Sequence, residues 1–598
     1  MSNEKNKLKK WIIIILSIVL ALAIAAGGTV WYFVSRKKQT DSDNKKGVVI
    51  ITEEELLEEE DVPDDVLEDL DIEPDLDDEP GSENKPNLDI LDEEDYDEEE
   101  TEYLLSILNS KSVNNNFIGF GAVYYPWLFW EDSLGRNYTD KQIQIELDRL
   151  VESGTTWIRS VIYARPEWYN SANDEWRYSG GHYEGLVKFF KEIDKRGIEV
   201  MLNFEWGESI QDTFGVFSNA TLKAYPTEKK IKMYGDFCTT FTKALKAEGI
   251  NCVKYLTFFS EPSNRKEQGM LYDTEEFDEV HVKKIVPFYT NLVKSVHDAF
   301  SEAGIRKDYK FIGNNQASAY ELNMYSWQQF KPMYDAAKEY LDEYSYHFYN
   351  YVSNPKGETY DDYAYLVNMF VEDVEKNLGV KANNTWFDEI NVAYNGTEGP
   401  IYDIYKKYGT GIYALKDEPY TATQLSNTLI SLLNGGYKTA ALWTFTSNLW
   451  PDSTQTGGSF GNGVFLCGVM PNLMESQVPY NTYYTYSLIS RYCNNAKKIY
   501  AGDNFYADSM ATSCVYDKDG NVTVYVVNSN LYDVKYKLEF EVPLDKKVMY
   551  RHLYDPQTFE SDTSAKPIGV DRVLVNVSGG IVDTIPAGAV AVYTTSKK

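Results

Sequence analysis

The sequence predicts an α/β protein: a (β/α)8 TIM barrel with a C-terminal antiparallel β-sandwich, preceded by a transmembrane helix and a disordered acidic linker. From about residue 115 an amphipathic helix, a glycine and a short apolar strand recur in that order, which is typical of parallel α/β folds. After about residue 496 short alternating strands replace this unit. The predicted segments are a cytoplasmic N-terminus (1–10), a transmembrane anchor (11–34), the linker (35–111), the barrel (112–496) and the β-sandwich (497–598).

The N-terminal residues predict a membrane anchor. The run from Trp11 to Val34 has 24 residues without a charge, which at about 1.5 Å per residue can span a bilayer core of about 30 Å. A cleaved signal peptide usually has a shorter apolar region of about 7 to 15 residues, although the small residues from Ala23 to Gly28 leave cleavage as an alternative. We therefore predict a single-pass protein of the cell membrane whose bulk is extracellular.

Residues 35–111 predict an extended acidic linker. Residues 41–102 contain 30 acidic and 3 basic residues, and such a run repels itself instead of folding. Pro63 and Pro74 are among the prolines that interrupt any helix there. Most of the formal net charge of −34 comes from this segment, so the rest is only mildly acidic. A charge of this sign argues against nucleic acid as a partner, because phosphate binding needs a basic surface.

Eight strands and a closing helix predict the barrel. Helices end before strands at Gly154, Gly197, Gly249, Gly304, Gly379 and the pair Gly435 and Gly436, where glycine suits a left-handed cap. The predicted strands are Phe117–Val123, Thr156–Tyr163, Glu199–Phe204, Val253–Phe259, Tyr309–Gly313, Glu343–Phe348, Asn384–Phe387 and Thr439–Phe445, and the closing helix is Tyr483–Cys493. Eight such units fit a closed barrel better than an open doubly wound sheet, and no GxGxxG follows the first strand.

Six short strands predict the β-sandwich. They are Ser513–Tyr516, Val522–Val527, Val534–Val542, Lys547–Leu553, Arg572–Val577 and Ala589–Thr594. The dipeptide Asp519-Gly520 is a hairpin signal between the first two. The alternation of apolar and polar residues in these strands is typical of an antiparallel sandwich.

Cysteine and histidine usage predicts neither a metal nor a cofactor. The five cysteines show no CxxC spacing and the five histidines are scattered without a ligand pattern. The cysteines are Cys238, Cys252, Cys467, Cys493 and Cys514. Buried thiols are the favoured interpretation, and a pair between Cys238 and Cys252 is the alternative.

Two predicted strands lead into a glutamate. Tyr255–Asn264 delivers Glu261, and Thr385–Asn391 delivers Glu389. Because the carboxyl ends of barrel strands gather on one face, these carboxylates are expected to lie together. Such a pair suits glycoside hydrolysis, where one group protonates the leaving oxygen and the other attacks. Asp388 is the rival of Glu389, but adjacent residues of a regular strand point to opposite faces, so only one is expected in the cleft.

With these glutamates after the fourth and seventh strands, the chain resembles the superfamily of retaining (β/α)8 glycoside hydrolases of clan A, which has xylosidase-like, glucocerebrosidase-like and cellulase-like members. The likeness covers Phe117 to Cys493, and Ile585 to Tyr593 is similar to the end of the sandwich in some members. The resemblance implies that Glu261 is the acid/base and Glu389 the nucleophile. The separation of two such carboxyl groups in retaining enzymes is about 5 to 5.5 Å.

The same resemblance implies several substrate-site residues. Arg159 matches the arginine that supports the nucleophile, His347 and Tyr349 match a His-x-Tyr pattern, and Trp443 matches the tryptophan under the sugar. A structural arginine pair and a core histidine are the alternative interpretations of the first two. Ser260 is a departure, because members typically carry asparagine there, and its amide contacts the sugar 2-hydroxyl. The shorter side chain bears on substrate preference and on activity.

Aromatic residues after the strands are expected to stack on sugar rings, since they lie in loops over the carboxyl face. The candidates are Tyr124, Tyr125, Trp127, Trp130, Trp206 and Trp450. Glu205, which ends the third strand, is a further carboxylate that could bind substrate or serve on the surface.

These observations predict a membrane-anchored, extracellular retaining glycosidase, monomeric and without a cofactor, whose partner is a carbohydrate. Its expected reaction is cleavage of β-glycosidic bonds in an oligo- or polysaccharide by double displacement. Two alternatives remain: a carbohydrate-binding surface protein with little turnover, which Ser260 favours, and a transglycosylase.

Overall fold

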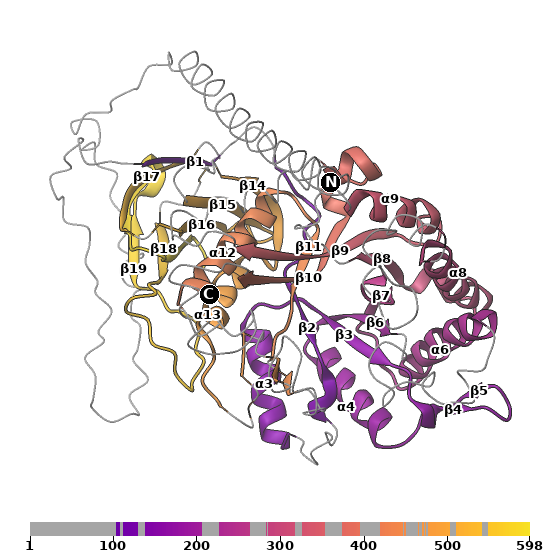
Figure 1. Cartoon of the computed structure of the whole chain (residues 1–598). Helices are drawn as coiled ribbons and strands as arrows, with labels where there is room; N and C mark the ends of the chain where they lie inside the picture. The colour runs from indigo at the N-terminus through magenta and orange to yellow at the C-terminus, as the bar shows by residue number, and fades with distance from the viewer. Residues whose placement is uncertain are drawn as a thin grey trace, which may run out of the picture. The chain divides into compact units, whose positions relative to one another are not determined.

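Eight parallel strands form a closed barrel in the order β10-β11-β2-β3-β6-β7-β8-β9 (Figure 1). In chain order they are β2 (Gly121–Tyr124), β3 (Trp157–Tyr163), β6 (Glu199–Glu205), β7 (Val253–Phe258), β8 (Lys310–Gln316), β9 (Glu343–Val352), β10 (Thr385–Tyr394) and β11 (Thr439–Leu442). Each predicted barrel strand overlaps one of these, which confirms the predicted fold class in this region.

The computed structural model describes part of the chain, and every described residue belongs to one compact unit, Lys85–Lys598. The described residues are 103–107, 112–129, 138–205, 227–262, 283, 285–316, 326–352, 373–394, 419–446, 448–449, 464–465, 469–471, 473, 476–502, 510–530, 532–540, 544 and 548–597.

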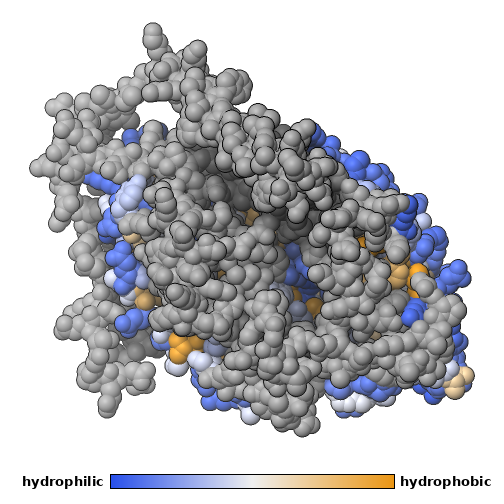
Figure 2. Space-filling view, in the orientation of Figure 1, coloured by the Kyte–Doolittle hydropathy of each residue, from blue (hydrophilic) through white to orange (hydrophobic). Residues whose placement is uncertain are grey.

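Helices surround the barrel strands. They are α3 (Asp140–Glu152), α4 (Gly181–Lys195), α6 (Thr227–Ala247), α8 (Val286–Glu302), α9 (Ser326–Ala337), α12 (Pro419–Asn434) and the closing helix α13 (Asn481–Cys493). The glycines predicted to end the helices have positive φ angles, with Gly436 in that role for the last pair. Figure 2 shows mostly hydrophilic residues on the coloured rim formed by α6, α8 and α9. Strands such as β3 are buried along almost their whole length because these helices cover their outer side.

Aromatic side chains fill the lower part of the barrel interior, near the strand beginnings. The ring centroid of Trp386 lies 5.1 Å from that of Trp157 and 4.8 Å from that of Tyr255. Trp157 Nε1 donates a hydrogen bond of 2.7 Å to Thr439 Oγ1. A Cβ on Gly121 would lie 2.4 Å from the Trp157 ring, so β2 needs glycine where this indole crosses it. The rings therefore form an apolar floor across the barrel.

Two antiparallel layers follow the barrel in sequence. One sheet has the order β14-β15-β16-β21-β18-β19, and the other contains β17 and β20. Their bounds are β14 (Ala496–Ala501), β15 (Met510–Asp517), β16 (Val522–Asn528), β17 (Val534–Phe540), β18 (Val548–Tyr554), β19 (Arg572–Val575), β20 (Ile581–Ile585) and β21 (Val590–Thr594). The six predicted strands are confirmed, and β14 and β20 were not predicted. Helices α12 and α13 contact strands of the larger sheet, which joins it to the barrel (Figure 1).

A third strand of the smaller sheet comes from the segment predicted to be linker. Strand β1 (Tyr103–Ile107) pairs in parallel with β17, with Tyr103 opposite Tyr536 and Ile107 opposite Phe540. The prediction of disorder was therefore wrong for these residues. The sequence did not predict this strand because the short run Tyr-Leu-Leu-Ser-Ile follows a strongly acidic segment. The hydrogen bonds that make the run a strand come from the edge of β17.

Other predictions for the N-terminal region remain untested. Segments 1–10, 11–34 and most of the linker lie outside the described residues. Of the helices that the structure does describe, none combines the length and the apolar character needed to cross a membrane. Among the described cysteines, Cys238, Cys252, Cys493 and Cys514 are buried free thiols, as favoured, so the proposed pair is absent; Cys467 lies outside these residues.

Candidate active site

A β-bulge in β10 brings two adjacent carboxyl groups into the barrel. Against β9, Phe387 is opposite Tyr346 and Glu389 is opposite His347, which leaves Asp388 as the extra residue. The pairing with β11 shifts at the same place. A bulge re-aims the side chains that follow it. The expected regular alternation is therefore absent here and both carboxyl groups lie near Arg159, but of the two only Glu389 is partly exposed, and its place in the cleft stays a prediction.

Strands β7 and β8 also end irregularly. Asn315 interrupts the register between β8 and β9, and its φ angle is 56°. After β7, Phe259 and Glu261 have φ angles of 58° and 50°. The Glu261 N–H donates to the Asn315 carbonyl oxygen at 2.9 Å, which ties the two strand ends together. These left-handed residues turn the chain at the point where the Glu261 side chain meets His347.

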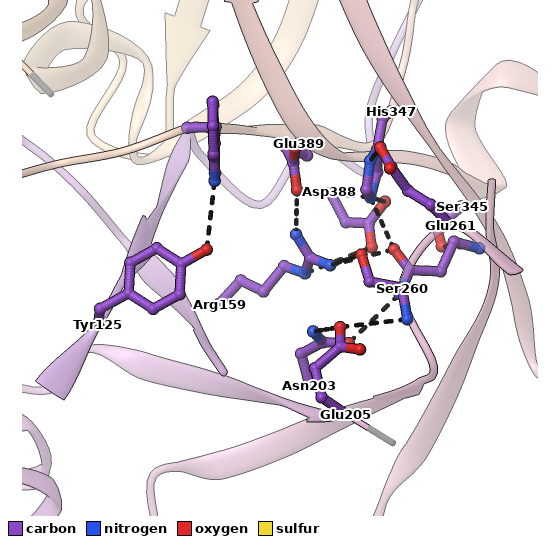
Figure 3. Close-up of polar contacts among 12 residues, drawn as sticks. Tyr125, Arg159, Asn203, Glu205, Ser260, Glu261, Ser345, His347, Asp388 and Glu389 are labelled. Atoms are coloured by element: carbon purple, nitrogen blue, oxygen red, sulfur yellow. Dashed lines mark hydrogen bonds and ion pairs between the residues drawn. The ribbon is translucent and has the colours of Figure 1, made fainter. Parts of the chain in front are cut away.

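Arg159 on β3 holds Glu389. Its Nη1 donates to Glu389 Oε2 at 2.6 Å, and its Nη2 donates to Ser260 Oγ at 3.0 Å (Figure 3). Burial by itself lowers the pKa of Arg159, but the carboxylates of Asp388 and Glu389 raise it above the ordinary value. A permanently charged, rigid guanidinium in direct contact suits an anionic Glu389. Arg159 thus contacts the residue that the resemblance implies, while its support of a nucleophile stays a prediction.

His347 on β9 contacts Glu261. Its Nδ1 lies 2.8 Å from Glu261 Oε1, and its Nε2 lies 3.6 Å from Glu389 Oε2. The imidazole is fully buried. Burial tends to lower the pKa of His347, yet the nearby carboxylates of Glu389, Glu261 and Asp388 raise it. His347 is thus both a buried histidine and a member of the site.

The two predicted glutamates lie close enough to act on one bond. One ligand atom each from Glu261, His347 and Glu389 lies within 4.8 Å of the others, so an oxygen of Glu261 and an oxygen of Glu389 are that close. Glu389 is 8 % exposed. The same three residues form the one group, within the described parts of the chain, that could hold a metal ion. A cation there would compete with Arg159, which already contacts Glu389.

Asp388 differs from Glu389 in its surroundings. It is 0 % exposed, and neither carboxyl oxygen has a hydrogen-bond partner. Arg159 Nε lies 3.7 Å and His347 Nε2 lies 3.9 Å from its oxygens. Burial raises the pKa of Asp388, although both cationic neighbours lower it. A carboxyl group without hydrogen bonds in such a place favours the neutral form, whereas Glu389 has a guanidinium donor.

Glu205 is a buried hydrogen-bond acceptor in the structure. It is 2 % exposed, and its Oε1 accepts hydrogen bonds from Asn203 Nδ2 at 2.8 Å and from the Ser260 N–H at 3.2 Å. Figure 3 shows Glu205 and Asn203 below Ser260. This carboxylate therefore holds the strand end that precedes Glu261. Its burial contradicts the expected surface role, and a role in substrate binding stays a prediction.

Aromatic candidates fall into three groups. Trp443 Nε1 donates to the Tyr125 hydroxyl at 3.3 Å, and both side chains are half-buried at the rim. Tyr124 is buried and donates to Glu146, so its prediction as a sugar platform was wrong. The side chains of the other candidates lie outside the described residues: Trp127, Trp130, Trp206, Tyr349 and Trp450.

Three asparagines of the site were missed in the sequence. Asn203 and Asn315 lie within the hydrogen-bonded layer around Arg159, and Asn391 Nδ2 donates to the Trp443 carbonyl oxygen. Asn203 and Asn391 lie on predicted strand stretches, so polar residues in apolar strands were the available signal. Asn315 follows the predicted end of its strand and gave no such signal.

Comparisons with known proteins give a fold and no family. No family model and no curated protein sequence matches the chain. Among solved structures, similarity is found to the catalytic domain of GH30 xylanase C from Talaromyces cellulolyticus, with 11 % identity, a TM-score of 0.51, and coverage of 83 % of this chain and 100 % of that one.

Two further solved structures are similar. One is AbfB, a family 51 α-L-arabinofuranosidase from Bifidobacterium longum, at 14 % identity and a TM-score of 0.53, covering 82 % of this chain and 99 % of that one. The other is the GH39 enzyme from Xanthomonas axonopodis pv. citri, at 12 % identity and a TM-score of 0.51, covering 83 % and 97 %. The chain therefore shares the fold of these enzymes, and its own structure is a closed eight-stranded parallel barrel with C-terminal antiparallel sheets.

Proposed function

We propose that the protein is a retaining glycoside hydrolase that cleaves β-glycosidic bonds in an oligo- or polysaccharide. The observation that carries the proposal is the pair of oxygens, one from Glu261 and one from Glu389, within 4.8 Å of each other on the carboxyl face of the barrel. Inverting enzymes separate their carboxyl groups by about 6.5 to 9.5 Å to admit a water molecule. The shorter distance here supports direct attack by one carboxylate.

The surroundings of the two glutamates assign their roles. In the first step the Glu389 carboxylate attacks the anomeric carbon, and Glu261 gives its proton to the glycosidic oxygen. That oxygen leaves with the rest of the saccharide. Arg159 keeps Glu389 in place for this attack. In the second step Glu261 takes a proton from water, the water oxygen attacks the anomeric carbon, and Glu389 is released as the carboxylate. Each residue returns to its starting state.

Asp388 is the weaker candidate for nucleophile. Its carboxyl group is completely buried, so a sugar carbon has no path to it, whereas Glu389 is partly exposed. Trp443 and Tyr125, at the rim beside β11 and β2, are suited to stack on the sugar bound above Glu389. Ser260 Oγ accepts from Arg159 and lies where relatives carry an amide, so a difference in recognition at the sugar C2 is expected.

The test uses the full-length protein in detergent with a panel of nitrophenyl glycosides and polysaccharides. We expect hydrolysis of at least one β-linked substrate, with proton NMR showing the β-anomer as the first product. The α-anomer as first product would contradict retention. Carbohydrate binding without hydrolysis would support the binding protein, and growth of added acceptor sugars would support the transglycosylase.

We also propose that residues 11–34 anchor the protein in the cell membrane, with residues 1–10 in the cytoplasm, and that the protein is monomeric. The length of the uncharged run supports the membrane anchor. We expect the protein to stay in membranes washed at alkaline pH, to be digested by protease added to intact cells, and to become soluble when residues 1–34 are deleted. An N-terminus found near Gly28 in the mature protein would show cleavage instead.

A further inference from the structure

Asn315 contacts Glu261 directly and is connected to Glu389 through Arg159. It lies at the bulge near the end of β8 and is 0 % exposed. Its carbonyl oxygen accepts the Glu261 N–H, and its side chain lies between Arg159, which holds Glu389, and His347, which contacts Glu261. Its own N–H donates to Ser345 Oγ at 3.1 Å, which fixes the bulge against β9.

Three hydrogen bonds hold the Asn315 amide group, two at Oδ1 and one from Nδ2. Oδ1 lies 3.2 Å from Arg159 Nη2 and 2.7 Å from His347 Nε2. Nδ2 lies 3.2 Å from Asn203 Oδ1, and the Nδ2 of Asn203 in turn donates to Glu205. The chain of donors thus runs in one direction from Arg159 to Glu205.

Arg159 fixes which amide atom faces the imidazole. A guanidinium has donors only, so the Asn315 atom beside it must be the oxygen. His347 Nε2 contacts the same oxygen, which has no proton to give. Nε2 must therefore carry a proton in both charge states of His347. That leaves Nδ1, 2.8 Å from Glu261 Oε1, as the nitrogen that gains and loses a proton.

We propose that Asn315 is a positioning residue that keeps a proton on Nε2 of His347, so that the titrating imidazole proton is always the one shared between Nδ1 and Glu261. The pair then holds one mobile proton, either as Glu261 O–H with neutral Nδ1 or as the Glu261 carboxylate with Nδ1–H. The same carbonyl oxygen anchors Arg159 Nη2, so Nη1 stays on Glu389. Through these contacts Asn315 couples the ionised state of Glu389, the nucleophile, to the protonation of Glu261, the acid.

The first test reads the tautomer and does not depend on turnover. The full-length protein is labelled with carbon-13 at histidine Cδ2, and a His347→Gln variant assigns the signal. Because the Cδ2 shift differs between the two neutral tautomers, we expect the wild type to show the Nε2–H form above the pKa of His347. We expect Asn315→Ala to lose this preference. An Nδ1–H form in the wild type would overturn the proposal.

The second test is the pH dependence of kcat/KM, and it rests on the proposed function. In Asn315→Asp the new carboxylate stabilises the imidazolium, which favours ionisation of Glu261, and it draws Arg159 away from Glu389. We expect the bell-shaped profile of kcat/KM against pH to become narrower. The acidic limb should move up and the basic limb should move down, each by about 1 pH unit. A purely structural role would lower activity and leave both limbs in place, which would contradict the proposal.

Ser345→Ala is the matched control. It removes the acceptor of the Asn315 N–H and leaves the amide oxygen where Arg159 and His347 can reach it. We expect a lower melting temperature with both limbs of the profile unmoved and the Nε2–H tautomer retained. If the wild type hydrolyses nothing, the proposed function fails, while the tautomer measurement still decides the role of Asn315.

Discussion

The lower and upper halves of the barrel interior are built from the same eight strands and have opposite character. Below, Trp157 and Trp386 pair with their neighbouring strands in regular register, Tyr255 follows a shift between β6 and β7, and the three rings pack against one another. Above, the bulges in β8 and β10 interrupt that register, and the side chains there are charged or amide groups. The apolar floor closes the barrel, whereas the polar layer surrounds the two glutamates.

The difference shows how the fold separates stability from chemistry. Regular strands place alternate side chains inward, which suffices to fill a core with large rings. A bulge adds a residue and brings adjacent side chains to one face, so Asp388 and Glu389 can both approach Arg159. Buried charges are stabilised only when they are paired, which explains why the upper layer is hydrogen-bonded and the lower one is mainly packed.

The largest expected effect is loss of turnover when either glutamate of the upper layer is replaced by glutamine. For Glu389→Gln and Glu261→Gln we expect kcat/KM on a β-linked substrate to fall by about 1,000-fold or more, because attack or proton transfer is removed. Steady-state kinetics with nitrophenyl and natural substrates measures this. Glu199→Gln is the matched control in the lower layer, where Glu199 accepts from the Tyr255 hydroxyl, and we expect less than about a threefold change there.

Substitutions in the apolar floor are expected to lower the free energy of unfolding and not to affect the chemical step directly. We expect Trp157→Ala to reduce the free energy of unfolding by about 3 to 5 kcal/mol, since it leaves a large cavity beside Trp386. Urea denaturation followed by circular dichroism measures this. Trp157→Phe keeps most of the ring and loses the hydrogen bond to Thr439, so about 1 to 2 kcal/mol is expected. Equal losses in both variants would contradict a packing role.

Replacing the shared guanidinium tests how the upper layer works as a unit. In Arg159→Lys a single ammonium cannot contact Glu389, Ser260 and Asn315 together. We expect kcat/KM to fall by about 100-fold, measured on the folded protein. Arg551→Lys is the control, because Arg551 is also buried between carboxylates, Asp571 and Asp583, but in the sandwich. It should lower the melting temperature and leave kcat/KM unchanged.

The smallest expected effect concerns the buried carboxyl group of Asp388. Since the native pKa of Asp388 is raised, the folded protein binds its proton more tightly than the unfolded chain, where Asp titrates near pH 3.9. The stability due to this proton is complete below that pH and is lost as the pH rises through the native pKa. We expect the melting temperature of Asp388→Asn, relative to wild type, to increase between pH 4 and 7. A pH-independent difference would show that Asp388 is not protonated in the fold.

The sequence by itself predicted most of the barrel. Helical and strand periodicity are local properties, and glycine marks the helix ends, so the residue pattern alone was enough to locate all eight strands and the two glutamates, Glu261 and Glu389. It also indicated Arg159 and His347 through resemblance. It failed at Tyr103–Ile107, whose strand depends on a partner more than 400 positions away.

Only the tertiary structure decided the directions and the hydrogen bonds of the side chains in the site. A bulge is a mismatch between two strands, so neither chain segment contains it alone, and the inward turn of Asp388 and Asn315 could not be derived from alternation. The protonation of His347 depends likewise on an oxygen brought from another strand. The local sequence pattern therefore determines which residues lie at the carboxyl ends of the strands. Contacts between strands determine the direction and the protonation state of their side chains.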